Sequence, residues 1–123
     1  MTDHQADEHK TIIAKFEEAV NMSPKELETW LKTKESQDVG QKKEGNESIG
    51  HQSGQQIIEI LHKKQSDYTN DDLSQMQRVI SYVHRHSAQR PNGDIEHTRW
   101  RYSLKNWGHD PLKANYREHD HSK

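Results

Sequence analysis

The stretch YTNDDLSQMQRVISYVHRHSAQRP, residues 68–91, contains a complete set of helix signals. Thr69 can serve as the N-cap, with Asp72 as its partner in a capping box. Large apolar side chains then recur at intervals of three and four residues, which is the helical period. They are Leu73, Met76, Val79, Ile80 and Val83. Pro91 disfavours helical backbone at Arg90, so this helix is expected to end before that residue.

Two more helices are predicted ahead of this stretch. Apolar side chains recur with helical spacing between residues 12 and 20, which predicts a first amphipathic helix. In NMSPKELETWL, residues 21–31, Ser23 is the expected N-cap, Pro24 suits the first helical position and Glu26 completes a capping box. The apolar residues of this second helix share one face: Leu27, Trp30 and Leu31.

The next segment, ESQDVGQKKEGNESIG, residues 35–50, shows no helical periodicity. A connection this long is uncommon in a small domain unless it has a function or is flexible. It leads into a helix expected to begin at Ser53, with Gln56 completing the capping box, and Gly54 would let another group approach the helix backbone closely. Backbone amides at a helix start beside lysines are typical of a phosphate site, and an unstructured loop fits the same sequence equally well.

After the helix that ends before Arg90, the chain predicts a turn and one more helix. Asn92–Gly93 is a typical turn pair. Asp94 can cap a last helix that continues to about Trp107, and Gly108 stands where a C-terminal cap is expected.

Two tryptophans in this last helix belong either to a buried stripe or to an exposed ligand platform. With about 100° of rotation per residue, Trp100, Leu104 and Trp107 fall within roughly 60° of one another. Such a stripe is more often core than surface, so the indoles are expected to anchor the helix. Arg101 and Lys105 flank the stripe, and we expect their cations to face a ligand.

The rest of the sequence shows neither the alternation typical of strands nor an internal repeat. The hydrophobic fraction of 28% is below the usual value of about 45–50%, which predicts a thin core. We expect an all-α fold: one compact domain of four to five helices over residues 9–112, with a long glycine- and lysine-containing loop between the second and third helices. Residues 1–8 and 113–123 are expected to be flexible tails.

Several classes of protein are disfavoured by the residues present. Without cysteine, the chain has no disulfide, no thiolate nucleophile and no cysteine-ligated zinc site. The N-terminus lacks a signal-peptide pattern, and no apolar run approaches the ~18 residues of a membrane span. The protein is therefore expected to be neither membrane-bound nor secreted. Its expected location is the cytoplasm, the nucleoid or the nucleus.

Candidates for catalysis are few. Glu59 with His62 and Asp94 with His97 have the spacing found in di-iron helical bundles. Glu59, however, lies about 200° around its helix from the apolar face, and Asp94 is needed as a cap, so a metal-dependent bundle enzyme is a remote alternative. No G-x-S-x-G motif is present, and a structural turn explains His109–Asp110 as well as a site does. We expect no catalytic residue, no metal and no cofactor.

Charge differs in kind between the two halves of the chain. All arginines lie after position 77, most lysines lie before position 65, and the net charge is -2. Guanidinium groups bind phosphate bidentately and stack on flat rings, whereas ammonium groups are hydrated point charges. From Arg78 to Lys105 the chain carries six lysines and arginines against two carboxylates. This favours a polyanionic partner, although basic residues near a helix end also compensate the helix dipole.

We expect phosphate contacts from these cations and from the glycine-rich loop. The candidates are Arg85, Arg90, Arg99, Arg101 and Lys105, with Lys42 and Lys43 as secondary contacts. Phosphate contacts supply affinity and carry no base sequence. The hypothesis is therefore a non-enzymatic protein that binds nucleic acid, DNA foremost, with little specificity. The alternative is a protein-interaction or stress-adaptor domain, in which the arginines pair with acidic neighbours and the Trp-Tyr segment docks a partner.

Four segments together resemble a known family: NMSPKELETWL, VGQKKEGNESIGHQSGQQIIEIL, VISYVHRHSAQRP and TRWRYSLKNWGHDPLK. Through them the chain is similar, over about residues 9–113, to a family of small uncharacterised proteins of bacteria and fungi, a domain of unknown function with some members labelled DNA-binding. The run ending NWGHDP is the most specific part. The resemblance implies kinship, and its label is consistent with a DNA partner. A weaker similarity relates SPKELETWL and GQQIIEIL to the helix-extended-loop-helix module of some DNA-binding proteins.

Overall fold

The computed structural model describes residues 2–40 and 49–113, and the regular elements in these ranges are all helical. In chain order they are α1 (Thr2–Ala19), α2 (Pro24–Leu31), α3 (Lys34–Gly40), α4 (Ile49–His62), the 3-10 turn η1 (Gln65–Asp67), α5 (Asn70–Ser87) and α6 (Arg99–Asn106). The expected all-α fold is confirmed.

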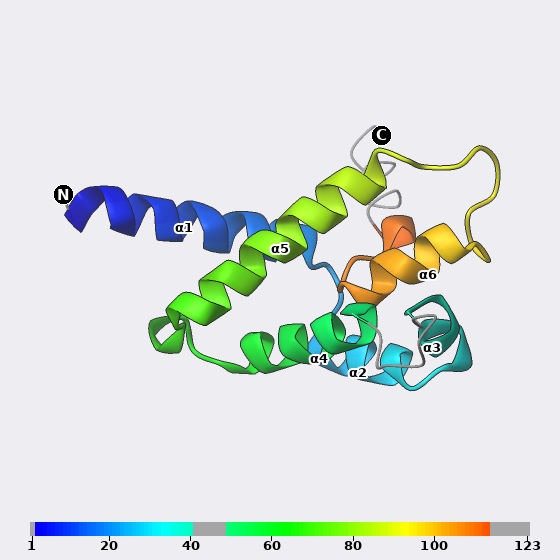
Figure 1. Ribbon diagram of the computed structural model, residues 1–123, viewed down its shortest axis with the longest axis horizontal. Helices are drawn as coiled ribbons and strands as arrows, with labels where there is room; N and C mark the ends of the chain where they lie inside the picture. Colours follow the sequence, from blue (N-terminus) through cyan, green and yellow to red (C-terminus); the bar gives the residue numbers. More distant parts are fainter. Residues whose placement is uncertain (1, 41–48, 114–123) are drawn as a thin grey trace.

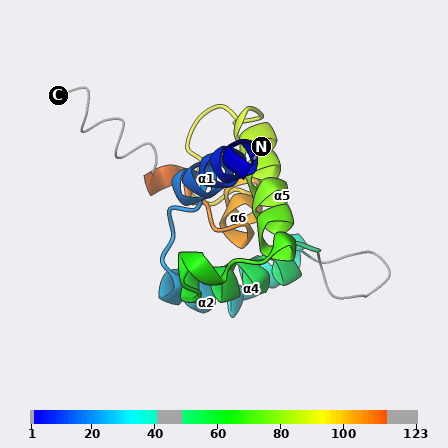
Figure 2. The ribbon, with the colours of Figure 1, turned by 90° about the vertical axis from the view of Figure 1, so that its left-hand side faces the viewer.

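The helices form two layers with α6 between them. Figure 2 shows α1 and α5 on one side of α6 and α2 and α4 on the other. α5 crosses the molecule diagonally and packs against α1, while α2 packs against α4 and α3 packs against α6 (Figure 1). Since α6 contacts helices of both layers, its apolar residues lie in the centre of the core. The most deeply buried apolar side chains are Phe16, Leu27, Ile57, Met76, Val79, Ile95 and Leu104.

The predicted capping boxes at the starts of α2 and α5 are confirmed. Ser23 Oγ accepts a hydrogen bond from the backbone N of Glu26 at 3.1 Å, and Glu26 Oε1 accepts one from the backbone N of Ser23 at 2.9 Å. Thr69 and Asp72 form the same reciprocal pair at 3.1 and 2.9 Å. The turn predicted after α5 is also present, with Gly93 at a φ of 84° that favours glycine.

The N-terminal segment differs from the expectation. α1 begins at Thr2, so residues 2–8, which the sequence predicts to be a tail, belong to the first helix. This part of α1 has no apolar stripe, but its glutamine, alanine and glutamate are good helix formers. At the other end of the chain the description stops at Lys113, and the rest of the tail expected over 113–123 lies outside the described residues.

The loop expected between the second and third helices is shorter than predicted. α3 occupies its first part, and α4 begins at Ile49. Ser53, the expected N-cap, lies buried within α4 instead. Residues 41–48, with the candidate cations Lys42 and Lys43, lie outside the described residues.

A buried asparagine joins α2, α3 and α6 and accounts for the position of α3. Asn106 Oδ1 accepts hydrogen bonds from Trp30 Nε1 at 2.7 Å and from Ser36 Oγ at 2.5 Å, and its Nδ2 donates to the Ser36 carbonyl at 3.1 Å. α4 approaches the same point at Gly54, where a Cβ would lie 2.8 Å from the carbonyl oxygen of Asn106 and 2.8 Å from Leu31 Cδ2. The close approach expected at Gly54 is confirmed, and the approaching groups belong to the protein's own core.

The start of α6 also differs from the expectation. Its first residue is Arg99 and its N-cap is Thr98, which accepts a hydrogen bond from the backbone N–H three residues on. Asp94, the expected cap, accepts a hydrogen bond from the backbone N of Glu96 at 3.0 Å instead. Ile95 between them is buried, so this segment forms a turn packed on the core ahead of the helix.

Candidate nucleic-acid interface

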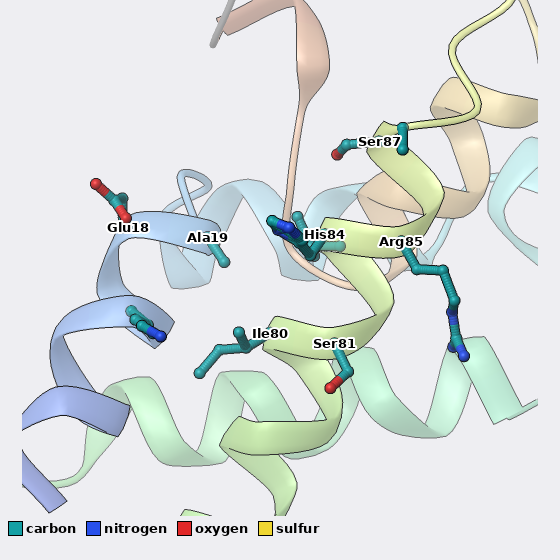
Figure 3. A pocket seen from close by; sticks show the side chains of 10 residues that line it. Glu18, Ala19, Ile80, Ser81, His84, Arg85 and Ser87 are labelled. Atoms are coloured by element: carbon teal, nitrogen blue, oxygen red, sulfur yellow. The ribbon is translucent and has the colours of Figure 1, made fainter. Parts of the chain in front are cut away.

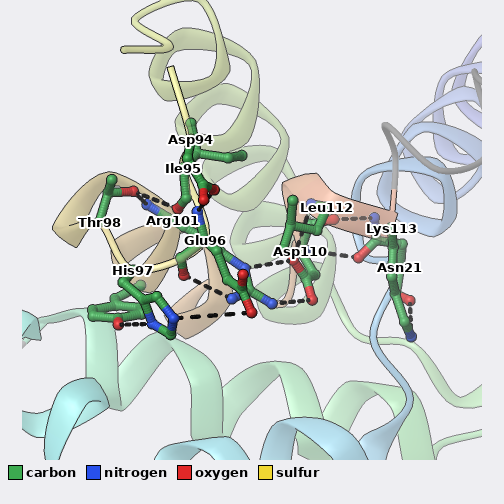
Figure 4. Close-up of polar contacts among 11 residues, drawn as sticks. Asn21, Asp94, Ile95, Glu96, His97, Thr98, Arg101, Asp110, Leu112 and Lys113 are labelled. Atoms are coloured by element: carbon green, nitrogen blue, oxygen red, sulfur yellow. Dashed lines mark hydrogen bonds and ion pairs between the residues drawn. The ribbon is translucent and has the colours of Figure 1, made fainter. Parts of the chain in front are cut away.

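The guanidinium of Arg101 is engaged inside the protein (Figure 4). Its Nε and Nη2 donate to the two carboxylate oxygens of Asp110 at 3.0 and 3.1 Å, and its Nη1 donates to the carbonyl of Glu96 at 2.9 Å. Both side chains of the ion pair are largely buried. Burial by itself raises the pKa of Asp110, but the hydrogen bonds and charge of Arg101 outweigh it and lower the pKa. The expectation that Arg101 faces a ligand is wrong, because its charge is paired within the fold.

Lys105, the other cation beside the tryptophan stripe, packs on α2. Its Nζ lies 4.1 Å from the centroid of the Trp30 ring, within the range of a cation–π interaction. Burial lowers the pKa of the Lys105 ammonium group, and the nearby charge of Arg101 lowers it further. Lys105 therefore lies beside the tryptophan stripe, as its rotation around α6 predicts. The space beside the stripe, which the sequence predicts to face a ligand, is filled by α2.

The turn formed by Gly108, His109 and Asp110 ties the C-terminal segment to the α1–α2 connection. Gly108 has a φ of 81°, and its carbonyl accepts a hydrogen bond from the backbone N of Asn21 at 3.1 Å. The Asn21 side chain forms two further hydrogen bonds with the backbone of Asp110 (Figure 4). His109 Nδ1 donates to the carbonyl of Ala19 at 2.7 Å, and burial lowers its pKa. These bonds give the His109–Asp110 pair a structural role.

Four arginines have exposed side chains that form no ion pair within residues 2–40 and 49–113: Arg78, Arg85, Arg90 and Arg99. Arg78 was not among the sequence candidates. It lies seven residues before Arg85 on α5, so both side chains share one helix face, about 10.5 Å apart along the axis. Residues 73–93, which include three of the four arginines, contain no aspartate or glutamate. This acid-free run is the sequence signal that identifies Arg78.

Arg78 and Arg85 line a surface groove between α5 and the end of α6. The other lining residues are Ser74, Gln77, Ser81, Tyr82 and Trp107. Hydroxyl, amide and ring groups therefore line this groove beside the two guanidinium groups, and among the described residues its lining contains no carboxylate. On its other side Arg78 borders a pocket that is also lined by Glu59, Asp71 and Asp72.

A column of four stacked rings begins in this groove and runs between α5 and α6. Tyr82 stacks on Trp107 with ring centroids 4.3 Å apart and planes at 11°, and on His86 at 5.1 Å and 18°. His86 stacks in turn on Trp100 at 6.2 Å and 19°. The guanidinium carbon of Arg90 lies 5.6 Å from the centroid of Trp100. We call these four rings the ring column; Arg90 lies at its Trp100 end.

The ring column is fixed from within. Trp100 Nε1 donates a hydrogen bond to the carbonyl of His86 at 2.7 Å. Burial lowers the pKa of the His86 imidazole, and its Nε2 is buried without a hydrogen-bond partner in the described part of the chain. Trp107 and Leu104 are buried and Trp100 is partly buried, which confirms the predicted core stripe.

A second groove separates α1 from α5 (Figure 3). Its apolar lining comes from Ala19, Ile80, Val83 and Ala88, and its polar lining from Lys15, Glu18, Ser81, His84, Arg85 and Ser87. Arg85 borders both grooves. This more apolar surface is the feature that favours a protein partner.

Within 2–40 and 49–113, no three histidine or carboxylate side chains are grouped to hold a metal ion. No helix in those ranges combines the length and the apolar character needed to cross a bilayer.

Comparison with known proteins gives one match. A family model described as "Protein of unknown function (DUF3140)" matches residues 15–105. No curated protein and no solved structure matches the chain. The matched range includes the exposed arginines of α5 and α6 and ends before Asp110.

Proposed function

Since the chain belongs to the DUF3140 family, whose description assigns no activity, we propose from the site itself that it is a non-enzymatic protein that binds nucleic acid through phosphates. One observation carries the proposal: Arg78, Arg85 and Arg90 are exposed along α5 and its C-terminal end, and residues 73–93 contain no carboxylate. We call these three side chains the arginine row.

The arginine row differs from the paired cations of the same fold. Arg101 has Asp110 within hydrogen-bond distance, and Lys63 and Lys113 also have carboxylate partners. Arg78 Nη1 donates a hydrogen bond to Gln75 Oε1 at 3.1 Å, and no carboxylate in the described ranges lies within ion-pair distance of the arginine row, so its charges are available to an external anion. Guanidinium groups suit phosphate oxygens, which they bind bidentately. Phosphate contacts carry no base sequence, so binding is expected to be weakly specific.

The alternative function is docking of a protein in the groove between α1 and α5. Its apolar lining from Ala19, Ile80 and Val83 is the observation that favours it. The two functions place different demands on Arg85, which borders both grooves. Phosphate binding needs its charge together with those of Arg78 and Arg90, whereas apolar docking does not depend on the last two.

Fluorescence anisotropy with labelled DNA at low salt tests the proposal. Replacing the arginine row with alanine removes three phosphate contacts and should weaken binding more than tenfold. The matched control replaces the exposed Lys25, Lys32 and Lys34 of the α2–α3 region with alanine, which removes the same charge elsewhere and should change affinity less than threefold. Equal losses in the two variants would contradict the proposal, as would the absence of binding by the unmodified protein.

A further inference from the structure

The ring column ends at a partly exposed indole. Trp100 stacks on His86, and its Nε1 is held by the His86 carbonyl at 2.7 Å, so the ring plane is fixed relative to α5. The exposed guanidinium of Arg90 lies 5.6 Å from the same ring. At the other end Trp107 is buried, and Tyr82 has neighbours on both faces. Trp100 is therefore the more exposed of the two end rings and the one on which another molecule can stack.

We propose that this end of the ring column binds an unpaired base, and that the protein prefers single-stranded nucleic acid to duplex. The proposal rests on the proposed function, since it assigns the form of nucleic acid that the arginine row binds. Unpaired bases stack on aromatic rings and on guanidinium planes. Arg90 extends the column by one such plane beside Trp100, and no carboxylate in the described ranges forms an ion pair with it.

Two features favour a single strand over a duplex. Bases in a duplex are covered above and below by their neighbours, so reaching Trp100 would require unpairing and unstacking. A flexible strand can instead place a base on Trp100 while its adjoining phosphates contact Arg85, which precedes His86 in the chain, and Arg78 further along α5.

The test separates stacking from charge by a matched pair of variants. Arg90→Lys keeps the positive charge but removes the planar guanidinium, and Arg85→Lys makes the same change at an arginine that has no cation–π contact in the described ranges. With a labelled 15-nucleotide oligo(dT) or oligo(U), Arg90→Lys should weaken binding about fivefold or more, the worth of one stacked base, and Arg85→Lys less than twofold. Trp100→Leu should reproduce the loss and Trp100→Phe should restore most of it.

The outcomes distinguish the two proposals. Both proposals are supported if oligo(dT) or oligo(U) binds more tightly than a duplex of equal length and if the variants lose affinity as described. The oligonucleotide that binds more tightly then shows whether DNA or RNA is preferred. Equal or tighter binding of the duplex, or equal effects of Arg90→Lys and Arg85→Lys, would overturn the single-strand preference and leave phosphate binding standing. Absence of binding to every oligonucleotide would overturn both.

Discussion

Replacing Arg101 with alanine should destabilise the fold without weakening nucleic-acid binding. The side chains of Arg101 and Asp110 are only 15% and 12% exposed. The variant therefore leaves the largely buried carboxylate of Asp110 without its charged partner. Breaking such a pair costs about 3–5 kcal/mol. For a domain of about 100 residues each kcal/mol shifts the melting temperature by about 4–8 °C, so the variant should melt at least about 12 °C lower.

Arg99→Ala is the matched control, because Arg99 is two residues away on α6, exposed and without an ion pair in the described ranges. Its effect on unfolding should stay within about 0.5 kcal/mol. Thermal melts by circular dichroism and urea unfolding by tryptophan fluorescence measure both variants. At a temperature where it is folded, Arg101→Ala should bind DNA within twofold of the unmodified protein. Equal stability of the two variants, or a loss of binding by Arg101→Ala comparable to that of Arg85→Ala, would refute the reasoning.

Three further predictions concern stability. The fold holds the pKa of Asp110 below its ordinary value, so the ion pair stabilises the protein above about pH 4, and this contribution is lost as the pH falls through the pKa of Asp110 in the folded protein. Urea titrations at decreasing pH should therefore show a smaller loss of unfolding free energy for Asp110→Asn than for the unmodified protein. An equal loss in the two proteins would contradict the assignment. Asn106→Leu leaves the donors on Trp30 and Ser36 without their acceptor and should cost about 2–4 kcal/mol in urea unfolding, whereas an unchanged midpoint would refute the role of Asn106. Gly54→Ala gains about 1 kcal/mol of helix propensity, but its Cβ would lie 2.8 Å from a backbone oxygen, so a net fall in melting temperature is expected and a rise would show that the helices can separate.

Local chemistry accounts for the parts of the fold that could be predicted. The capping boxes at Ser23 and Thr69 involve residues three apart, so each is visible in a short window of sequence. The position of α3 could not be predicted in this way. It depends on Ser36 meeting Asn106, seventy residues away in the chain, and nothing in the sequence around Ser36 indicates that partner.

The same limit applies to the candidate site. Rotation around a helix correctly placed Arg101 and Lys105 beside the tryptophan stripe, but it could not show that Asp110 and Trp30 come to lie against them. Two of the seven candidate cations are thereby occupied within the fold. Arg78 could have been found from its seven-residue spacing to Arg85, because that spacing places both side chains on one face of α5.

The salt dependence of binding tests the central claim, that the arginine row contacts phosphates, most directly. Log Kobs for a labelled oligo(dT) is measured against log salt concentration for the unmodified protein and for the variant with Arg78, Arg85 and Arg90 replaced by alanine. Each lost phosphate contact flattens the slope by about 0.7 for a single strand, so the variant's slope should be shallower by about 2 units. Parallel lines for the two proteins would contradict the claim.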